Sequence, residues 1–87
     1  MDPKKLRKAS REFNRYRAPE CRVKTIKNSR DRLVVKFEGT GANFYCCYDE
    51  NFIDYLYYLK DHTGESMKIK DVRQPAPDSF IVIYEKD

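Results

Sequence analysis

The segment from Phe80 to Tyr84 constrains the fold more than any other part of this sequence. It reads Phe-Ile-Val-Ile-Tyr, five consecutive apolar residues of β-branched and aromatic type. Successive side chains of a strand point to opposite faces of a sheet, so a strand with one face in water would have polar residues at alternate positions. A strand whose side chains are apolar on both faces is typical of the interior of a sheet. We therefore predict that this segment lies in the middle of the sheet or beneath both layers.

Periodicity and turn residues predict the remaining elements. Asp2 and Pro3 favour the start of a helix that ends at Ala18-Pro19, with Tyr16 on its apolar face. A second helix is predicted over residues 50–61, capped by Asp49, with Ile53 on its apolar face. The loop residues His62-Thr63-Gly64 would end it, with Gly64 in the left-handed conformation. Further strands are predicted over residues 21–27, 32–38, 44–48 and 67–72. The order is α-β-β-β-α-β-β in one domain spanning residues 1–87. Because the links between strands are short, we predict an α+β fold of two layers, a mainly antiparallel sheet and two helices.

This element order and general character resemble those of small, functionally uncharacterised α+β proteins of methanogenic archaea. The resemblance spans the whole chain and implies a similar fold in a cytoplasmic setting. The first five predicted elements also follow the order of the double-stranded-RNA-binding domain, which opens its second helix with a lysine-rich phosphate-binding motif. Residues 48–52 read Tyr-Asp-Glu-Asn-Phe at that place, and their carboxylates would repel phosphates. We therefore do not extend that function to this chain.

Composition excludes several classes of protein. With 87 residues, the chain has room for one domain and one core. Hydrophobic residues make up 40% and aromatic residues 14%, which argues against intrinsic disorder. No apolar run approaches the ~20 residues of a membrane span, and the first residues lack the apolar region of a signal peptide. Three cysteines, an odd number without framework spacing, favour a reducing compartment, so we expect a cytoplasmic protein.

Charge is distributed unevenly along the chain. Residues 1–36 contain thirteen Lys or Arg against four Asp or Glu, whereas residues 37–87 contain five against ten. Five cations fall on one side of the first helix, opposite its apolar face: Lys4, Arg7, Lys8, Arg11 and Arg15. The first hairpin would widen this patch with Arg22, Lys24, Lys27, Arg30 and Arg32. Nonspecific nucleic-acid binding, a charged protein partner and a simple solvated face are the three interpretations of this stripe.

The second predicted helix has the opposite charge. Glu50, Asp54 and Asp61 share one side of it, Asp49 precedes them, and no Lys or Arg lies on that side. Like charges four residues apart destabilise a helix, so solubility alone is a weak explanation. Oxygen-rich sites suit Ca²⁺, and we predict a weak Ca²⁺ site formed by Asp49, Glu50 and Asp54. A solvated face and a surface for a basic partner are the alternatives.

Catalytic chemistry has little support in the sequence. There is one histidine, His62, and no recognisable pairing of a nucleophile with a base. We predict a non-enzymatic binding protein without an organic cofactor, whose partner is a divalent cation or, alternatively, nucleic acid or a charged protein surface, and which does not contact membranes. The two charged helix faces are complementary, so we expect self-association only at low salt and high concentration.

Overall fold

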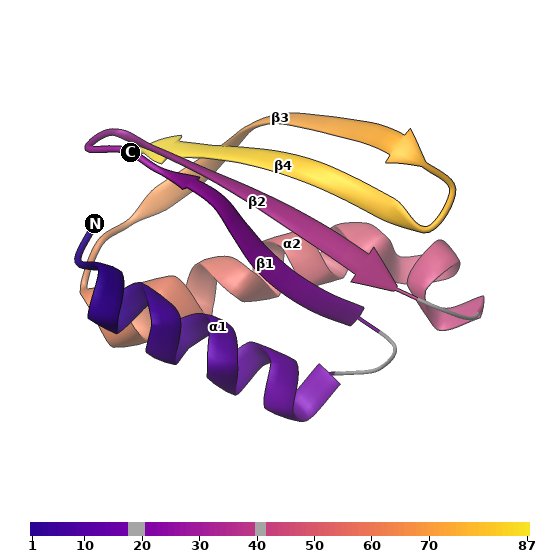
Figure 1. The fold of residues 1–87 in the computed structure, drawn as a ribbon, viewed down its shortest axis with the longest axis horizontal. Helices are drawn as coiled ribbons and strands as arrows, with labels where there is room; N and C mark the ends of the chain where they lie inside the picture. The colour runs from indigo at the N-terminus through magenta and orange to yellow at the C-terminus, as the bar shows by residue number, and fades with distance from the viewer. Residues whose placement is uncertain (18–20, 40–41) are drawn as a thin grey trace.

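The computed structural model describes the backbone of residues 1–17, 21–39 and 42–87, and the side chains of residues 1–17, 21–39 and 50–87. Two helices and four strands make up the described chain (Figure 1). In chain order they are α1 (Pro3–Arg17), β1 (Cys21–Asn28), β2 (Arg32–Gly39), α2 (Ala42–Thr63), β3 (Met67–Ala76) and β4 (Ser79–Lys86). The fold class is α+β, as predicted.

The four strands form one antiparallel sheet in the order β1-β2-β4-β3. β4 contains the apolar run of residues 80–84 and lies between β2 and β3, which confirms the prediction of an interior strand. β2 and β3 both run antiparallel to β4 and are therefore parallel to each other. The connection β2-α2-β3 is thus a split β-α-β crossover with β4 inserted between its two strands.

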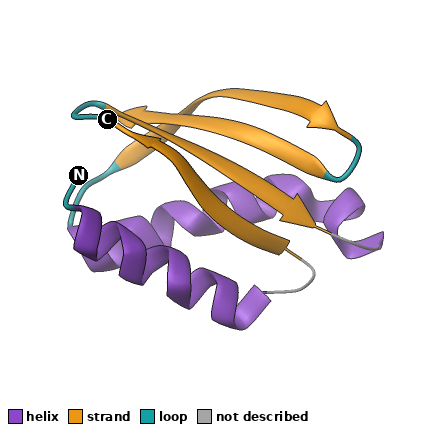
Figure 2. Ribbon diagram, in the orientation of Figure 1, coloured by secondary structure: helices purple, strands orange, loops and turns teal. Residues whose placement is uncertain are grey.

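The molecule has two layers (Figure 2). Both helices lie on the same face of the sheet, and no described element covers the opposite face. Side chains at alternate positions of the two central strands confirm this arrangement, because Val35 and Val82 are fully buried whereas Val34 and Ile83 are half-buried. The helices therefore enclose the core on one side and leave the other side of the sheet open.

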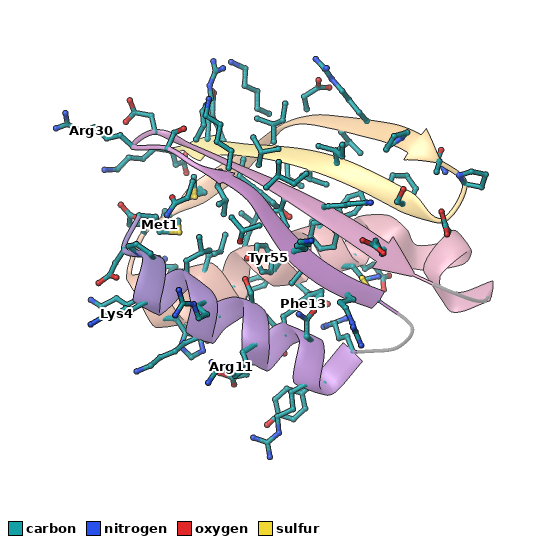
Figure 3. All side chains as sticks on the ribbon, in the orientation of Figure 1. Met1, Lys4, Arg11, Phe13, Arg30 and Tyr55 are labelled. Atoms are coloured by element: carbon teal, nitrogen blue, oxygen red, sulfur yellow. The ribbon has the colours of Figure 1, made fainter. Side chains whose placement is uncertain are left out.

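Aromatic rings fill the space between the layers. The ring of Phe13 on α1 packs edge-on against Phe37, Tyr55 and Tyr58, with centroids 5.9, 5.4 and 5.6 Å away. Phe13 and Tyr55 are completely buried and lie between the helices and the sheet (Figure 3). The buried hydroxyl of Tyr84 donates a hydrogen bond to the carbonyl of Phe52, so its polar group is satisfied within the core.

The second helix differs from the prediction. Residues 44–48, predicted as a strand, lie within α2, which begins at Ala42 and continues to Thr63. A five-residue apolar run fits either a strand or a buried helix, and Asp49 looked like an N-cap although the helix passes through it. The 22 residues of α2 extend about 33 Å at 1.5 Å per residue, and the longest dimension of the molecule is 33 Å. The strand prediction and the α-β-β-β-α order shared with the double-stranded-RNA-binding domain are therefore wrong.

The N-terminus of α1 and the C-terminus of α2 agree with the sequence prediction. The backbone N–H of Lys4 donates to Oδ1 of Asp2 at 2.9 Å, which confirms Asp2 as the N-cap of α1. α2 ends at Gly64, whose φ of 76° is the left-handed conformation that glycine adopts without strain. Two predicted core residues are exposed instead: Tyr16 at 66% and Ile53 at 47%. Tyr55 occupies the core position on α2.

Candidate functional site

The five cations predicted on the first helix form one exposed stripe along α1. Leu6, Ala9 and Phe13 are buried on the side that faces the sheet. Lys4 and Arg11 point away from the sheet on the opposite side (Figure 3). We call Lys4, Arg7, Lys8, Arg11 and Arg15, all exposed, the α1 stripe. From the first to the last member it extends about 16 Å at the helical rise of 1.5 Å per residue.

A second group of cations lies on the first hairpin, whose strand β1 packs along α1. These hairpin cations are Arg22, Lys24, Lys27, Arg30 and Arg32, and all five are exposed. Arg7 of the α1 stripe lines a surface hollow together with Thr25 and Asn28 of β1, so the stripe lies beside the edge strand of the sheet. Arg22 and Lys24 alternate with the buried Cys21 and Val23, so they point to the open face of the sheet, away from the helices. We call the two groups together the basic surface, which spans both sides of this edge of the molecule.

The hydrogen bonds of Asn14 explain why α1 lies along β1. Its side-chain amide donates to the carbonyl of Val23 at 3.0 Å, and its side-chain oxygen accepts from the N–H of Val23 at 2.7 Å. The Asn14 side chain thus satisfies the N–H and the C=O of Val23. These two groups face the outer edge of β1, where no further described strand pairs with them. This clamp fixes the position of the α1 stripe relative to the hairpin cations.

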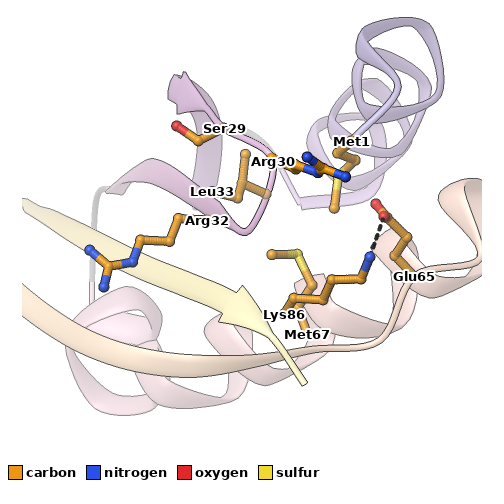
Figure 4. Close-up of a pocket in the computed structure, with 8 residues that line it drawn as sticks. All are labelled: Met1, Ser29, Arg30, Arg32, Leu33, Glu65, Met67 and Lys86. Carbon is orange, nitrogen blue, oxygen red and sulfur yellow. Dashed lines mark ion pairs between the residues drawn. The ribbon is translucent and has the colours of Figure 1, made fainter.

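The end of the hairpin is closed by apolar side chains and one ion pair (Figure 4). The hollow shown there is lined by Met1, Ser29, Arg30, Arg32, Leu33, Glu65, Met67 and Lys86. Nζ of Lys86 lies 3.8 Å from a carboxylate oxygen of Glu65, so Lys86 is neutralised. Arg30 and Arg32 have no such partner among the described residues, and they extend the basic surface to this end of the sheet.

The cations of the basic surface and those of β3 differ in whether they form ion pairs. None of the ten cations of the basic surface lies within ion-pair distance of a carboxylate in the described part of the chain. In contrast, Lys68 and Lys70 of β3 both lie close to Glu85, at 3.9 and 3.4 Å, and Arg73 pairs with Asp71 at 3.1 Å. The cations of residues 1–36 therefore mostly lack a carboxylate partner among the described residues, whereas each cation of β3 lies close to a carboxylate.

One arginine of α1 is neutralised by α2. Nη2 of Arg17 lies 2.6 Å from Oδ2 of Asp54, and Nη1 donates to Oδ1 of Asn51 at 3.0 Å. The guanidinium also lies over the ring of Phe13, 5.1 Å from its centroid. The acidic side of α2 therefore has a cation after all, supplied by the neighbouring helix and not by α2 itself.

A second contact between the helices involves the single histidine. Nε2 of His62 lies 2.5 Å from Oε2 of Glu12. The sequence suggested that His62 is a loop residue, but it belongs to the last turn of α2. Glu12 is thereby engaged with α2, although it lies beside Lys8, Arg11 and Arg15 on α1.

The predicted calcium ligands are only partly described. The side chain of Asp49 lies outside the described residues, Glu50 is exposed, and Asp54 pairs with Arg17. Asp49 and Glu50 also lie two turns inside α2 and not at its N-terminus. Among the side chains that the structure describes, no three from His, Cys, Asp and Glu come together in a way that would hold a metal ion. The calcium site stays a prediction.

A Ca²⁺ titration followed by ¹⁵N NMR tests this site. Affinity should be weak, at ~10⁻⁴–10⁻³ M, and the amides of residues 48 to 55 should shift. Arg17→Gln should strengthen binding, because Asp54 then loses a competing cation, and Asp54→Asn should abolish the shift. Amides that stay in place in both the natural protein and Arg17→Gln would contradict a calcium site.

Buried nucleophiles in the core are held in their protonated forms. Burial raises the pKa of the Cys21 thiol to about 12, although the charge of Arg17 acts in the opposite direction. Burial likewise raises the pKa of Tyr55 to about 12, opposed by its hydrogen bond with Ser10. Neither group supplies a reactive anion at neutral pH.

Comparison with known proteins gives no match: no family model, curated protein or solved structure resembles this chain significantly. Nor does any helix in the described part of the chain have the length and apolar character needed to cross a membrane.

Proposed function

We propose that this protein binds nucleic acid through its basic surface, by electrostatic attraction to phosphates and without sequence preference. The observation that carries the proposal is the lack of a carboxylate partner for all ten cations of that surface among the described residues. Lysines and arginines that are free of internal partners can release counterions when they neutralise phosphates. The proposal describes a binding protein and requires no catalytic group.

The positions of the charges favour this function over a simple solvated surface. Lys4 and Lys5 lie in the first turn of α1, where positive charge opposes the helix dipole at a cost of a few tenths of a kcal/mol each. The first turn contains no acidic residue. A helix whose exposed side serves only for solubility gains more from carboxylates at that end. Binding to phosphates supplies a reason for cations there.

This proposal predicts different effects for two variants with the same change of net charge. Lys8→Gln combined with Arg11→Gln removes two members of the α1 stripe. Lys68→Gln combined with Lys70→Gln removes two cations of β3 that both lie close to Glu85. Fluorescence anisotropy with a labelled DNA duplex of about 20 base pairs, in ~0.1 M salt, measures the affinities of both variants and of the natural protein.

We expect the α1 variant to bind at least about tenfold more weakly than the natural protein, and its salt slope to be about two units flatter. The β3 variant should bind within about threefold of the natural protein, because its lysines lie outside the basic surface. Equal losses in both variants would show that only net charge matters and would contradict an interface at α1. No binding by the natural protein would refute the proposed function itself.

A further inference from the structure

The aromatic residues of this protein are arranged in a way that restricts the kind of nucleic acid it fits. The large rings of the core are buried: Phe13, Phe37, Phe52, Tyr55, Phe80 and Tyr84. Among the described residues, only Tyr16 and Tyr57 are exposed aromatic side chains, at 66% and 65%. Tyr57 belongs to α2, outside the basic surface. Tyr16 lines the same surface hollow as Lys8, Arg11 and Arg15 of the α1 stripe. The guanidinium of Arg15 lies over its ring, with the guanidinium carbon 5.8 Å from the ring centre.

The open face of the sheet also lacks a stacking platform. Four-stranded sheets that bind single-stranded RNA stack its bases on aromatic side chains of the exposed face. Here the central strands present Val34, Ile81 and Ile83 at the corresponding positions, and all three are half-buried aliphatic residues. Single-strand binders gain about 1–3 kcal/mol from each stacked base, and the described surface offers no ring for this on the sheet.

Arg15 already lies over the ring of Tyr16, and no other exposed ring is described on the basic surface, so affinity depends mainly on how densely the ligand presents phosphates. A duplex carries one charge per ~1.7 Å of its axis with both strands counted, so a length of about 16 Å, that of the α1 stripe, contains about ten phosphates, twice the number of cations on the stripe. For each phosphate that is neutralised, a duplex releases about 0.9 counterions and a single strand about 0.7. The same number of phosphate contacts therefore contributes more binding free energy on a duplex than on a single strand.

We infer that the ligand of the basic surface is a duplex nucleic acid, recognised through its phosphate backbone, and not a single strand. This inference rests on the proposed function and names its ligand class. Five contacts on the α1 stripe give a salt slope of about −4.5 for a duplex and about −3.5 for a single strand. At ~0.1 M salt this difference of one unit corresponds to about tenfold tighter binding of the duplex.

The test compares a labelled DNA duplex of about 20 base pairs with each of its separated strands, chosen without self-complementarity, in a salt series. We expect the duplex to bind about tenfold more tightly at ~0.1 M salt and its slope to be steeper by about one unit. Single strands that bind as tightly as the duplex, or more tightly, would overturn the inference and leave the proposed function intact. If neither form binds, the proposed function fails as well.

Tyr16→Leu provides a matched control for stacking. Tyr16 is the one exposed ring among the described residues of α1, and leucine keeps an apolar side chain of similar size there. We expect this variant to bind both forms with unchanged affinity and the same preference for the duplex. A selective loss of single-strand binding, of about fivefold or more, would show that a base stacks on this ring and would overturn a phosphate-only interface.

Discussion

Replacing Phe13 with alanine is expected to cost about 3–5 kcal/mol of unfolding free energy, because a completely buried ring leaves a cavity that the surrounding core fills only in part. Phe13 joins α1 to β2 and α2 through edge-on contacts with Phe37, Tyr55 and Tyr58. Domains of this size have a total stability of about 4–13 kcal/mol. The substitution therefore removes a large part of the stability, or all of it.

Thermal unfolding followed by circular dichroism measures this effect. For a domain of 60–100 residues, each kcal/mol shifts the Tm by roughly 4–8 °C, so Phe13→Ala should lower it by at least about 12 °C. Tyr57→Ala is the matched control, because its aromatic side chain is 65% exposed, and it should change the stability by no more than about 0.5 kcal/mol. Similar Tm values for both variants would contradict the position of Phe13 at the centre of the core.

Local sequence patterns were sufficient to predict most of the fold. The strand at residues 80–84 was predicted in the interior of the sheet because its apolar residues occupy both faces, and β4 lies between β2 and β3. The N-cap at Asp2 and the left-handed glycine at Gly64 depend on neighbouring residues only, and both are observed. Features that arise within one turn or one strand are thus readable from sequence.

The start of α2 was not predictable in the same way. Residues 44–48 form a short apolar run of aromatic and cysteine residues, which are common in strands. Asp49, directly after this run, is a good helix cap by residue type. Both local signals therefore indicated a boundary, yet the helix continues through it from Ala42. Intrinsic preference is a weak guide where tertiary structure determines the length of an element.

In the candidate site, too, local features could be predicted from sequence and tertiary contacts could not. The α1 stripe could be predicted because helical periodicity alone places its members on one side, and all five are exposed. The ion pair between Arg17 and Asp54 could not, because its partners are 37 residues apart and meet only through packing of α1 against α2. The contact between Glu12 and His62, 50 residues apart, was missed for the same reason. Whether a charged side chain has an ion-pair partner depends on the fold. Among the described residues, the cations of β3 have carboxylate partners and those of the basic surface do not.

Raising monovalent salt from about 50 to about 200 mM is expected to weaken binding of a DNA duplex about 500-fold, if each of the five cations of the α1 stripe neutralises one phosphate. Contacts from the hairpin cations would steepen this dependence further. Because phosphates are common to all sequences, duplexes of different sequence should respond alike. Association constants measured by fluorescence anisotropy across a salt series give the slope directly. Binding that survives half-molar salt, or that differs by more than about tenfold between sequences, would mean that base contacts or apolar contacts dominate and that the basic surface is not the interface.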